Sequence, residues 1–166
     1  MPTGRNTFAL ATLLLALHPG ASAVAQDVPV YKDDRSDPGA LIQSLYNAIE
    51  RREYLRAWSY FDEGVVADPE RFSAGYEQTA HVRLKLGEVT GEGAAGSLYG
   101  SVPVAVEATA EDGTVSVFTG CYETRQVQPA AQIEPPFSPI RIIAGKLEET
   151  TASLDSAVGD CPQEGL

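Results

Sequence analysis

Between residues 38 and 78 the apolar positions follow the period of α-helices. Asp37 and Pro38 suit a helix N-cap and the first helical position. An apolar face follows them at spacings of three, four and seven, formed by Leu41, Ile42, Leu45 and Ile49, and we expect this helix to end near Arg52. The same spacing indicates a second, short helix through Tyr54, Ala57, Trp58 and Phe61. A third helix is expected after Asp68 and Pro69, with Phe72 and Tyr76 turned inward.

After residue 80 the apolar period changes to two, the period of half-buried strands. Alternating valines and leucines predict one strand in HVRLKLGEV, residues 81–89, and another in LYGSVPVAVEATA, residues 98–110. Asp112 and Gly113 are the favoured pair of a hairpin turn, and residues 114–125 predict the next strand. Residues 126–139 hold four prolines and predict a loop before a last strand over Ile140–Leu147. Helices followed by a four-stranded antiparallel sheet make an α+β domain.

The two ends of the chain differ from this domain. Residues 1–25 have the pattern of a removable secretory signal: Arg5, a ten-residue apolar run over 8–17, and small residues that allow cleavage after Ala23 or Ala25. The apolar run would rise only about 15 Å as a helix, half of a bilayer core, which disfavours a membrane anchor. Residues 26–37 are expected to form an extended arm, and residues 148–166 an acidic tail.

The net charge of −11 disfavours nucleic acids and anionic membranes as binding partners, because an acidic surface repels nucleic acid phosphates and anionic lipid. The charge also keeps a protein soluble. Arginine outnumbers lysine nine to three, and alanine, glycine and valine are abundant. That composition is typical of a GC-rich bacterium. Together with the signal, it predicts a periplasmic or secreted protein.

Cys121 and Cys161 are the only two cysteines. In an oxidising compartment such a pair predicts a disulfide, here one that would pin the tail 148–166 to the domain 38–147. The alternatives are a metal site and a catalytic thiol. His81 is the only histidine that remains after signal removal, so the ligands for zinc are too few and a catalytic thiol would have a single histidine available. We expect no metal.

Residues 91–96 read GEGAAG and match the glycine pattern of dinucleotide sites. Such a site needs these glycines between a strand and a helix, because the helix N-terminus holds the pyrophosphate. Here a valine-rich strand containing Pro103 follows instead. We therefore interpret the stretch as a flexible turn region between two strands, and expect no nicotinamide cofactor and no other cofactor.

The order of elements, together with LYNAIERREYLRAWSYF at residues 45–61, resembles the NTF2-like superfamily, in which a curved sheet wraps three helices into a cone. The chain is also similar to small secreted alphaproteobacterial proteins of unknown function, through the stretches SLYNAI (44–49), AWSYF (57–61) and GCY (120–122). The resemblance spans about residues 38–147. It implies an NTF2-like α+β cone, and it carries no catalytic signature.

Enzymes of that superfamily need a carboxylate base inside an apolar cone. Glu107, Glu123 and Arg125 lie in predicted strands and are candidates to point into it, or else belong to a solvated sheet face. Six aromatic residues either line a pocket or form the core: Tyr46, Tyr54, Trp58, Tyr76, Tyr99 and Tyr122. Our candidate pocket lining is Trp58, Tyr99, Tyr122 and Glu123.

We expect a binding or interaction module without catalytic residues, whose partner is a small apolar ligand or another protein. One alternative is a small isomerase or cyclase that uses a strand carboxylate in the cone. Another is a structural protein of the bacterial envelope that forms a homodimer through its sheet. An enzyme requires a desolvated carboxyl group in the cavity. A binder requires an aromatic-lined cavity without one, and a dimer requires an exposed apolar sheet face.

Overall fold

The computed structural model describes Met1, residues 28–163 and residues 165–166. The predicted signal and its cleavage positions Ala23 and Ala25 lie outside the described residues. The elements are, in chain order, α1 (Pro38–Glu50), α2 (Tyr54–Trp58), α3 (Pro69–Ala74), β1 (Thr79–Leu86), β2 (Thr90–Ala94), β3 (Ser97–Ala110), β4 (Val115–Val127), the 3-10 turn η1 (Pro129–Ala131) and β5 (Arg141–Thr150). In the described segments, none of the helices has the length and apolarity needed to span a bilayer.

The caps that the sequence predicts are present at α1 and α3. Asp37 accepts a hydrogen bond from the backbone N–H of Ala40, and Asp68 accepts one from Arg71, each just ahead of a proline. A cap of this kind satisfies a donor that the first helical turn leaves free. The α+β prediction is confirmed, with the helices first and an antiparallel sheet after them.

The sheet has five strands, so the prediction of four is wrong by one. Its order is β1-β3-β4-β5, and β2 pairs with the other end of the long strand β3. The extra strand is Thr90–Ala94, which overlaps the glycine-rich stretch 91–96. It turns back into β3 at Ala95 and Gly96, which have φ values of 47° and 75°. GEGAAG is therefore a hairpin, and a strand rather than a helix follows it.

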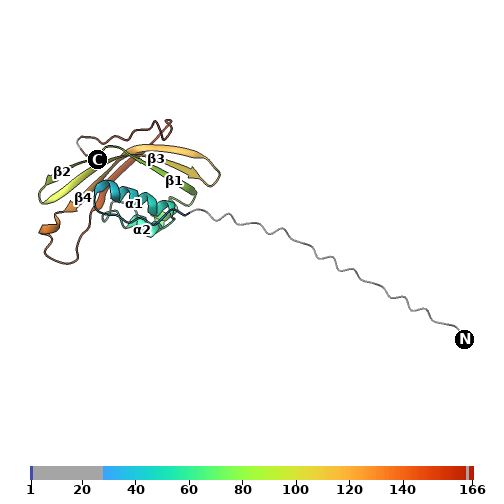
Figure 1. Ribbon diagram of the computed structural model, residues 1–166, viewed down its shortest axis with the longest axis horizontal. Coiled ribbons are helices and arrows are strands. Elements are labelled where there is room, and N and C mark those ends of the chain that lie inside the picture. Colours follow the sequence, from blue (N-terminus) through green and yellow to red (C-terminus); the bar gives the residue numbers. More distant parts are fainter. Residues whose placement is uncertain (2–27, 164) are drawn as a thin grey trace.

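One face of the curved sheet wraps α1, and the core lies between them (Figure 1). Leu41, Ile42 and Leu45 of α1 are at most 1% exposed, and they pack with Val102, Val104 and Ile142 from the sheet. We call this the inner face of the sheet. The sheet does not close: β1 and β5 remain at its two ends, and a short parallel bridge between Phe61 and Ile142 extends the β5 side.

The opposite, outer face of the sheet carries the chain after β5, drawn in red in Figure 1. Because β5 runs to Thr150, this tail begins at residue 151 and not at 148 as predicted. Leu154 and Ala157 pack on Ala105 and Val117 in a second, small core. Cys161 is joined to Cys121 of β4 as predicted, with their Cα atoms 5.0 Å apart. We call residues 151–163 the strap.

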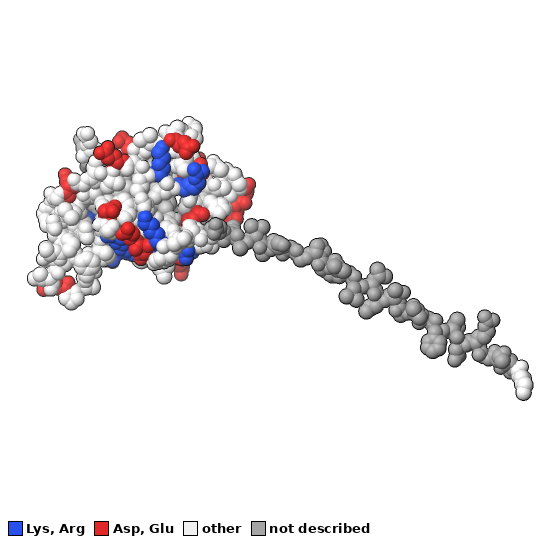
Figure 2. Space-filling model, viewed as in Figure 1, with Lys and Arg blue, Asp and Glu red and all other residues white. Residues whose placement is uncertain are grey.

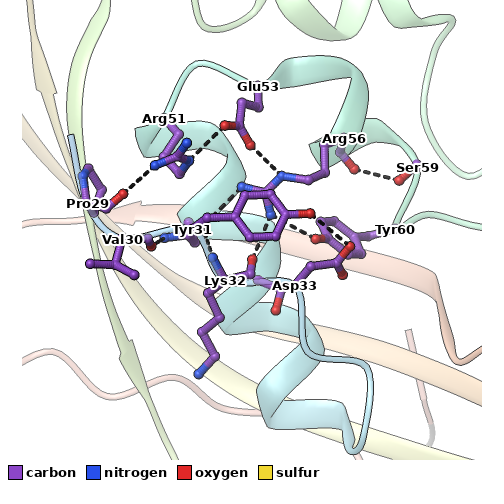
Figure 3. Close-up of polar contacts among 12 residues, drawn as sticks. Pro29, Val30, Tyr31, Lys32, Asp33, Arg51, Glu53, Arg56, Ser59 and Tyr60 are labelled. Carbon is purple, nitrogen blue, oxygen red and sulfur yellow. Dashed lines mark hydrogen bonds and ion pairs between the residues drawn. The ribbon is translucent and has the colours of Figure 1, made fainter.

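Residues 28–37 of the N-terminal arm form neither helix nor strand, and they are docked on α1 and α2 (Figure 3). Asn47 accepts a hydrogen bond from the backbone N–H of Lys32 and donates one to the carbonyl of Val30, both at 2.9 Å. The side chain of Arg56 donates to the carbonyl of Lys32 at 2.7 Å and lies over the ring of Tyr31. The arm is therefore part of the folded domain.

Acidic and basic side chains lie interspersed on the face of the molecule that Figure 2 shows.

Candidate functional site

An open hollow of about 390 Å³ lies between α1 and β1, and its lining includes Tyr46 and Glu50. The rest of the space between helices and sheet, where the NTF2-like resemblance implies a pocket, is occupied by packed side chains. At its centre the hydroxyl groups of Tyr46 and Tyr122 lie 2.8 Å apart, and both residues are buried. Each hydroxyl thereby satisfies the other, as a buried tyrosine requires. Among the described residues, the buried polar side chains are those of Ser44, Ser97 and Thr124, so no described carboxylate is buried there.

Burial raises the pKa of Tyr46 and of Tyr122 well above the usual value, and the neighbouring phenol adds to the effect at Tyr46. Burial likewise raises the pKa of Tyr76 to about 12, with a smaller contribution from Tyr54. A phenol held neutral in this way does not serve as a base at neutral pH. The interior of the domain thus has the character of a structural core.

We expect the protein to unfold in alkali as these tyrosines ionise. Their folded-state pKa exceeds the unfolded value of about 10, so the stability that they contribute is intact below pH 10 and is lost as the pH rises toward 12. Phenolate absorbance at 295 nm and circular dichroism should therefore report ionisation of Tyr46 and Tyr122 and loss of structure at the same pH. Complete ionisation of all tyrosines in a protein that keeps its circular dichroism would contradict this expectation.

The outer face carries a more promising site, an open groove of about 710 Å³ between the sheet and the strap. One wall is the sheet surface, where Tyr99 and Ser101 of β3 and Glu123 of β4 face outward. The other wall is the end of the strap, from Asp160 to Gln163, with Gly165 beyond it. The volume falls within the range of small-molecule sites, about 300–1,000 Å³.

Carboxylates dominate the charge of this groove. Glu88, Glu92 and Asp160 have exposed side chains, and Glu123 is half-buried. Among the described residues that line the groove there is no lysine and no arginine. One carboxylate oxygen of Glu123 accepts a hydrogen bond from the backbone N–H of Leu166 at 2.8 Å. The groove therefore combines negative charge, a phenol ring and several hydroxyl groups, in a position open to solvent.

The strap that walls the groove is held by polar as well as apolar contacts. The ammonium group of Lys85 donates to the carbonyls of Asp155 and Ala157, at 2.7 and 2.8 Å, and more weakly to that of Leu154. Gly159 lies directly on the sheet: a Cβ there would overlap the backbone of Val104 and would come within 2.8 Å of the carbonyl oxygen of Gly120. Only glycine allows this approach.

The structure separates the four residues that we selected as pocket lining. Tyr99 and Glu123 line the outer groove together. Tyr122 lies on the inner face against Tyr46, and Trp58 lies on α2, where its indole N–H donates to the carbonyl of Ala67 at 2.8 Å. These four residues therefore do not form one pocket.

The other strand candidates also lie on the outer face. Glu107 is paired with Arg83 at 3.0 Å, and Arg125 donates to Ser97 and lies 6.0 Å from the centre of the Tyr99 ring.

The side chain of His81 forms a hydrogen bond with Glu50 at the end of α1. In the described part of the chain, no group of three or more histidine, cysteine or acidic residues is arranged to hold a metal ion.

Three acidic residues of the groove were not selected from the sequence: Glu88, Glu92 and Asp160. Glu88 and Glu92 flank the start of β2, which the apolar pattern does not reveal because every residue of β2 is exposed. Asp160 precedes Cys161 directly, so the predicted disulfide was a signal that could have placed it near β4.

No protein-family model and no curated protein matches this chain. Among solved structures, the chain is similar to a proposed dehydratase of the NTF2-like family from Streptomyces avermitilis, at 12% identity over 69% of this chain and 94% of that one, with a TM-score of 0.48. It is also similar to a protein of unknown function from Mycobacterium tuberculosis, at 16% identity over 73% of this chain and 79% of that one, with a TM-score of 0.49. Similarity at this level transfers neither an activity nor a ligand to this chain.

Proposed function

We propose that this protein is an exported, non-catalytic binding module and that its ligand occupies the groove between the strap and the outer face of the sheet. The observation that carries this proposal is the groove itself. It has the size of a small-molecule site, and one of its walls is tied to the other by a disulfide. A wall fixed in advance lowers the entropy that a ligand would otherwise lose in ordering it.

Binding is better supported than catalysis by the surroundings of the acidic groups. A general base on a carboxylate works at neutral pH when burial raises its pKa. In the groove the side chains of Glu88, Glu92 and Asp160 are exposed to water, and Glu107 is paired with Arg83. At the centre of the interior, where a cone enzyme would hold its base, lies the Tyr46–Tyr122 pair. The carboxylate of Glu50, at the hollow beside this pair, is hydrogen-bonded to His81 and to the backbone N–H of Val82.

Export is supported by the signal pattern of residues 1–25 and by the disulfide, since disulfides persist in oxidising compartments. A homodimer formed through the outer face is less well supported. The apolar residues Ala105 and Val117 of that face are already covered by Leu154 and Ala157 of the strap.

The chemistry of the lining favours a ligand that carries amino groups. Four carboxylates surround the groove, and the described lining offers them no cationic side chain. An ammonium group can pair with Glu92 or Glu123, while the ring of Tyr99 already has the guanidinium group of Arg125 on one side. The apolar ligand that the sequence led us to expect fits this lining less well.

Spermidine is a suitable probe, and calorimetric titration of the oxidised protein should detect its binding. Glu123→Gln keeps the acceptor for Leu166 and removes one charge, so we expect spermidine to bind about fivefold more weakly, or about 1 kcal/mol for one partly exposed pair. Glu77→Gln is the matched control, because Glu77 is exposed and lies outside the groove lining. An equal loss in both variants would indicate general charge attraction, and no binding by the parent would reject the amine ligand.

A further inference from the structure

The strap is attached to the domain at two separate places. The first attachment, over residues 152–157, is non-covalent: Leu154 and Ala157 pack on Ala105 and Val117, and Lys85 holds the carbonyl groups of the same turn. Within that turn, the backbone N–H of Ala157 donates to the carbonyl of Ser153 at 2.8 Å. This half of the strap needs no disulfide to stay in place.

The second attachment is the bond between Cys161 and Cys121. The residues around it, from Asp160 to Gln163, are those that wall the groove. Their side chains are exposed or half-buried, and they contribute none of the buried apolar residues of either core. The disulfide is the covalent tie between this end and the sheet, and the hydrogen bond from the backbone N–H of Leu166 to Glu123 is a second contact. Pro162 also lies beside β5.

The two cysteines differ in their exposure to solvent. Cys121 is 1% exposed, and Cys161 is half-buried in the strap. We therefore expect a thiolate from a dithiol reductant to attack Sγ of the more exposed Cys161, and Cys121 then leaves as a thiolate that takes up a proton. The second thiol of the reductant then releases Cys161, which leaves two cysteine thiols and the reductant as a disulfide.

We infer that the Cys121–Cys161 disulfide is a redox gate for the groove: reduction frees the groove wall at residues 160–163, while the strap over residues 152–157 and the domain beneath it stay folded. The inference rests on the proposed function, because it concerns the same groove. The oxidised form presents a fixed wall to the ligand, and the reduced form presents the open face of the sheet. Binding in the groove would thus depend on the redox state of the surroundings.

The full oxidised protein, labelled with ¹⁵N, tests this inference before and after treatment with dithiothreitol. Heteronuclear NOE values of Asp160, Cys161 and Gln163 should fall on reduction, to the range of flexible chain, and should stay high at residues 152–157. The affinity for spermidine should fall at least tenfold and should return when the protein is reoxidised. A variant that combines Cys121→Ala with Cys161→Ser should behave as the reduced protein in both conditions.

The possible outcomes distinguish a failure of the redox gate from a failure of the proposed function. Unchanged NOE values at Asp160, Cys161 and Gln163, a parallel fall at residues 152–157, or loss of far-ultraviolet circular dichroism on reduction would each overturn the gate. If the oxidised protein fails to bind spermidine, the amine ligand of the proposed function is rejected, and the NOE values still decide on the gate. If reduction frees the wall but leaves the affinity within twofold, the wall does not control binding and the inference is wrong.

Discussion

Loss of the Cys121–Cys161 bridge is expected to lower the free energy of unfolding by about 4 kcal/mol, which is the chain-entropy estimate for a closed loop of 40 residues. For a domain of this size the corresponding fall in melting temperature is roughly 10–15 °C. The variant to measure combines Cys121→Ala with Cys161→Ser, because alanine at the buried position 121 avoids burying a hydroxyl group. Urea and thermal unfolding, followed by circular dichroism, give both quantities.

The parent protein in dithiothreitol is the control, and its stability should approach that of the variant. Because the helices and the sheet pack through an inner core to which the strap contributes no residue, both proteins should remain folded at 25 °C. A variant as stable as the oxidised parent would contradict the expectation, since the bridge would then close a loop that is already ordered in the unfolded state.

The fold was predictable where the sequence carries a local signal. The Asp-Pro pairs at 37–38 and 68–69 begin α1 and α3, and the alternation of Val102, Val104 and Val106 identifies β3. β2 escaped prediction for a physical reason. Its five residues are all exposed and include two glycines, so the strand has no buried apolar face that a sequence pattern could reveal. It is a strand because its backbone pairs with β3.

The candidate site was predictable only in part, and the reason is strand geometry. Consecutive residues of a strand face opposite sides, so Tyr122 and Glu123 could not line the same face of β4. Cys121 is two residues before Glu123, so strand alternation puts Glu123 on the same face as the disulfide and the strap. We did not use this relation when we considered Glu123 as a residue of the cone. The positions of Glu88 and Glu92 depend on β2, and no local pattern in the sequence gives them.

The second large loss of stability is expected when Arg56 is replaced, because this residue holds the N-terminal arm to the helices (Figure 3). Its side chain is only 13% exposed. Its guanidinium group donates to four acceptors within 3.0 Å: Glu53, the carbonyl of Lys32, the hydroxyl of Tyr60 and the amide oxygen of Asn47. It also lies 4.5 Å from the centre of the Tyr31 ring. One side chain therefore joins three parts of the chain: the arm, α1 and α2.

We expect Arg56→Met to lower the free energy of unfolding by about 3 kcal/mol. Methionine keeps the apolar stem, so the loss measures the hydrogen bonds of a charged group, worth about 1.5–3 kcal/mol each and less than additive when they share one donor. Arg52→Met is the matched control, since Arg52 is 48% exposed and its ion pair with Glu111 lies at the surface, where about 0.5 kcal/mol is usual. Urea unfolding of both variants makes the comparison, and hydrogen exchange should show the arm opening in Arg56→Met alone. Equal stabilities of the two variants would mean that packing on α1, and not Arg56, holds the arm.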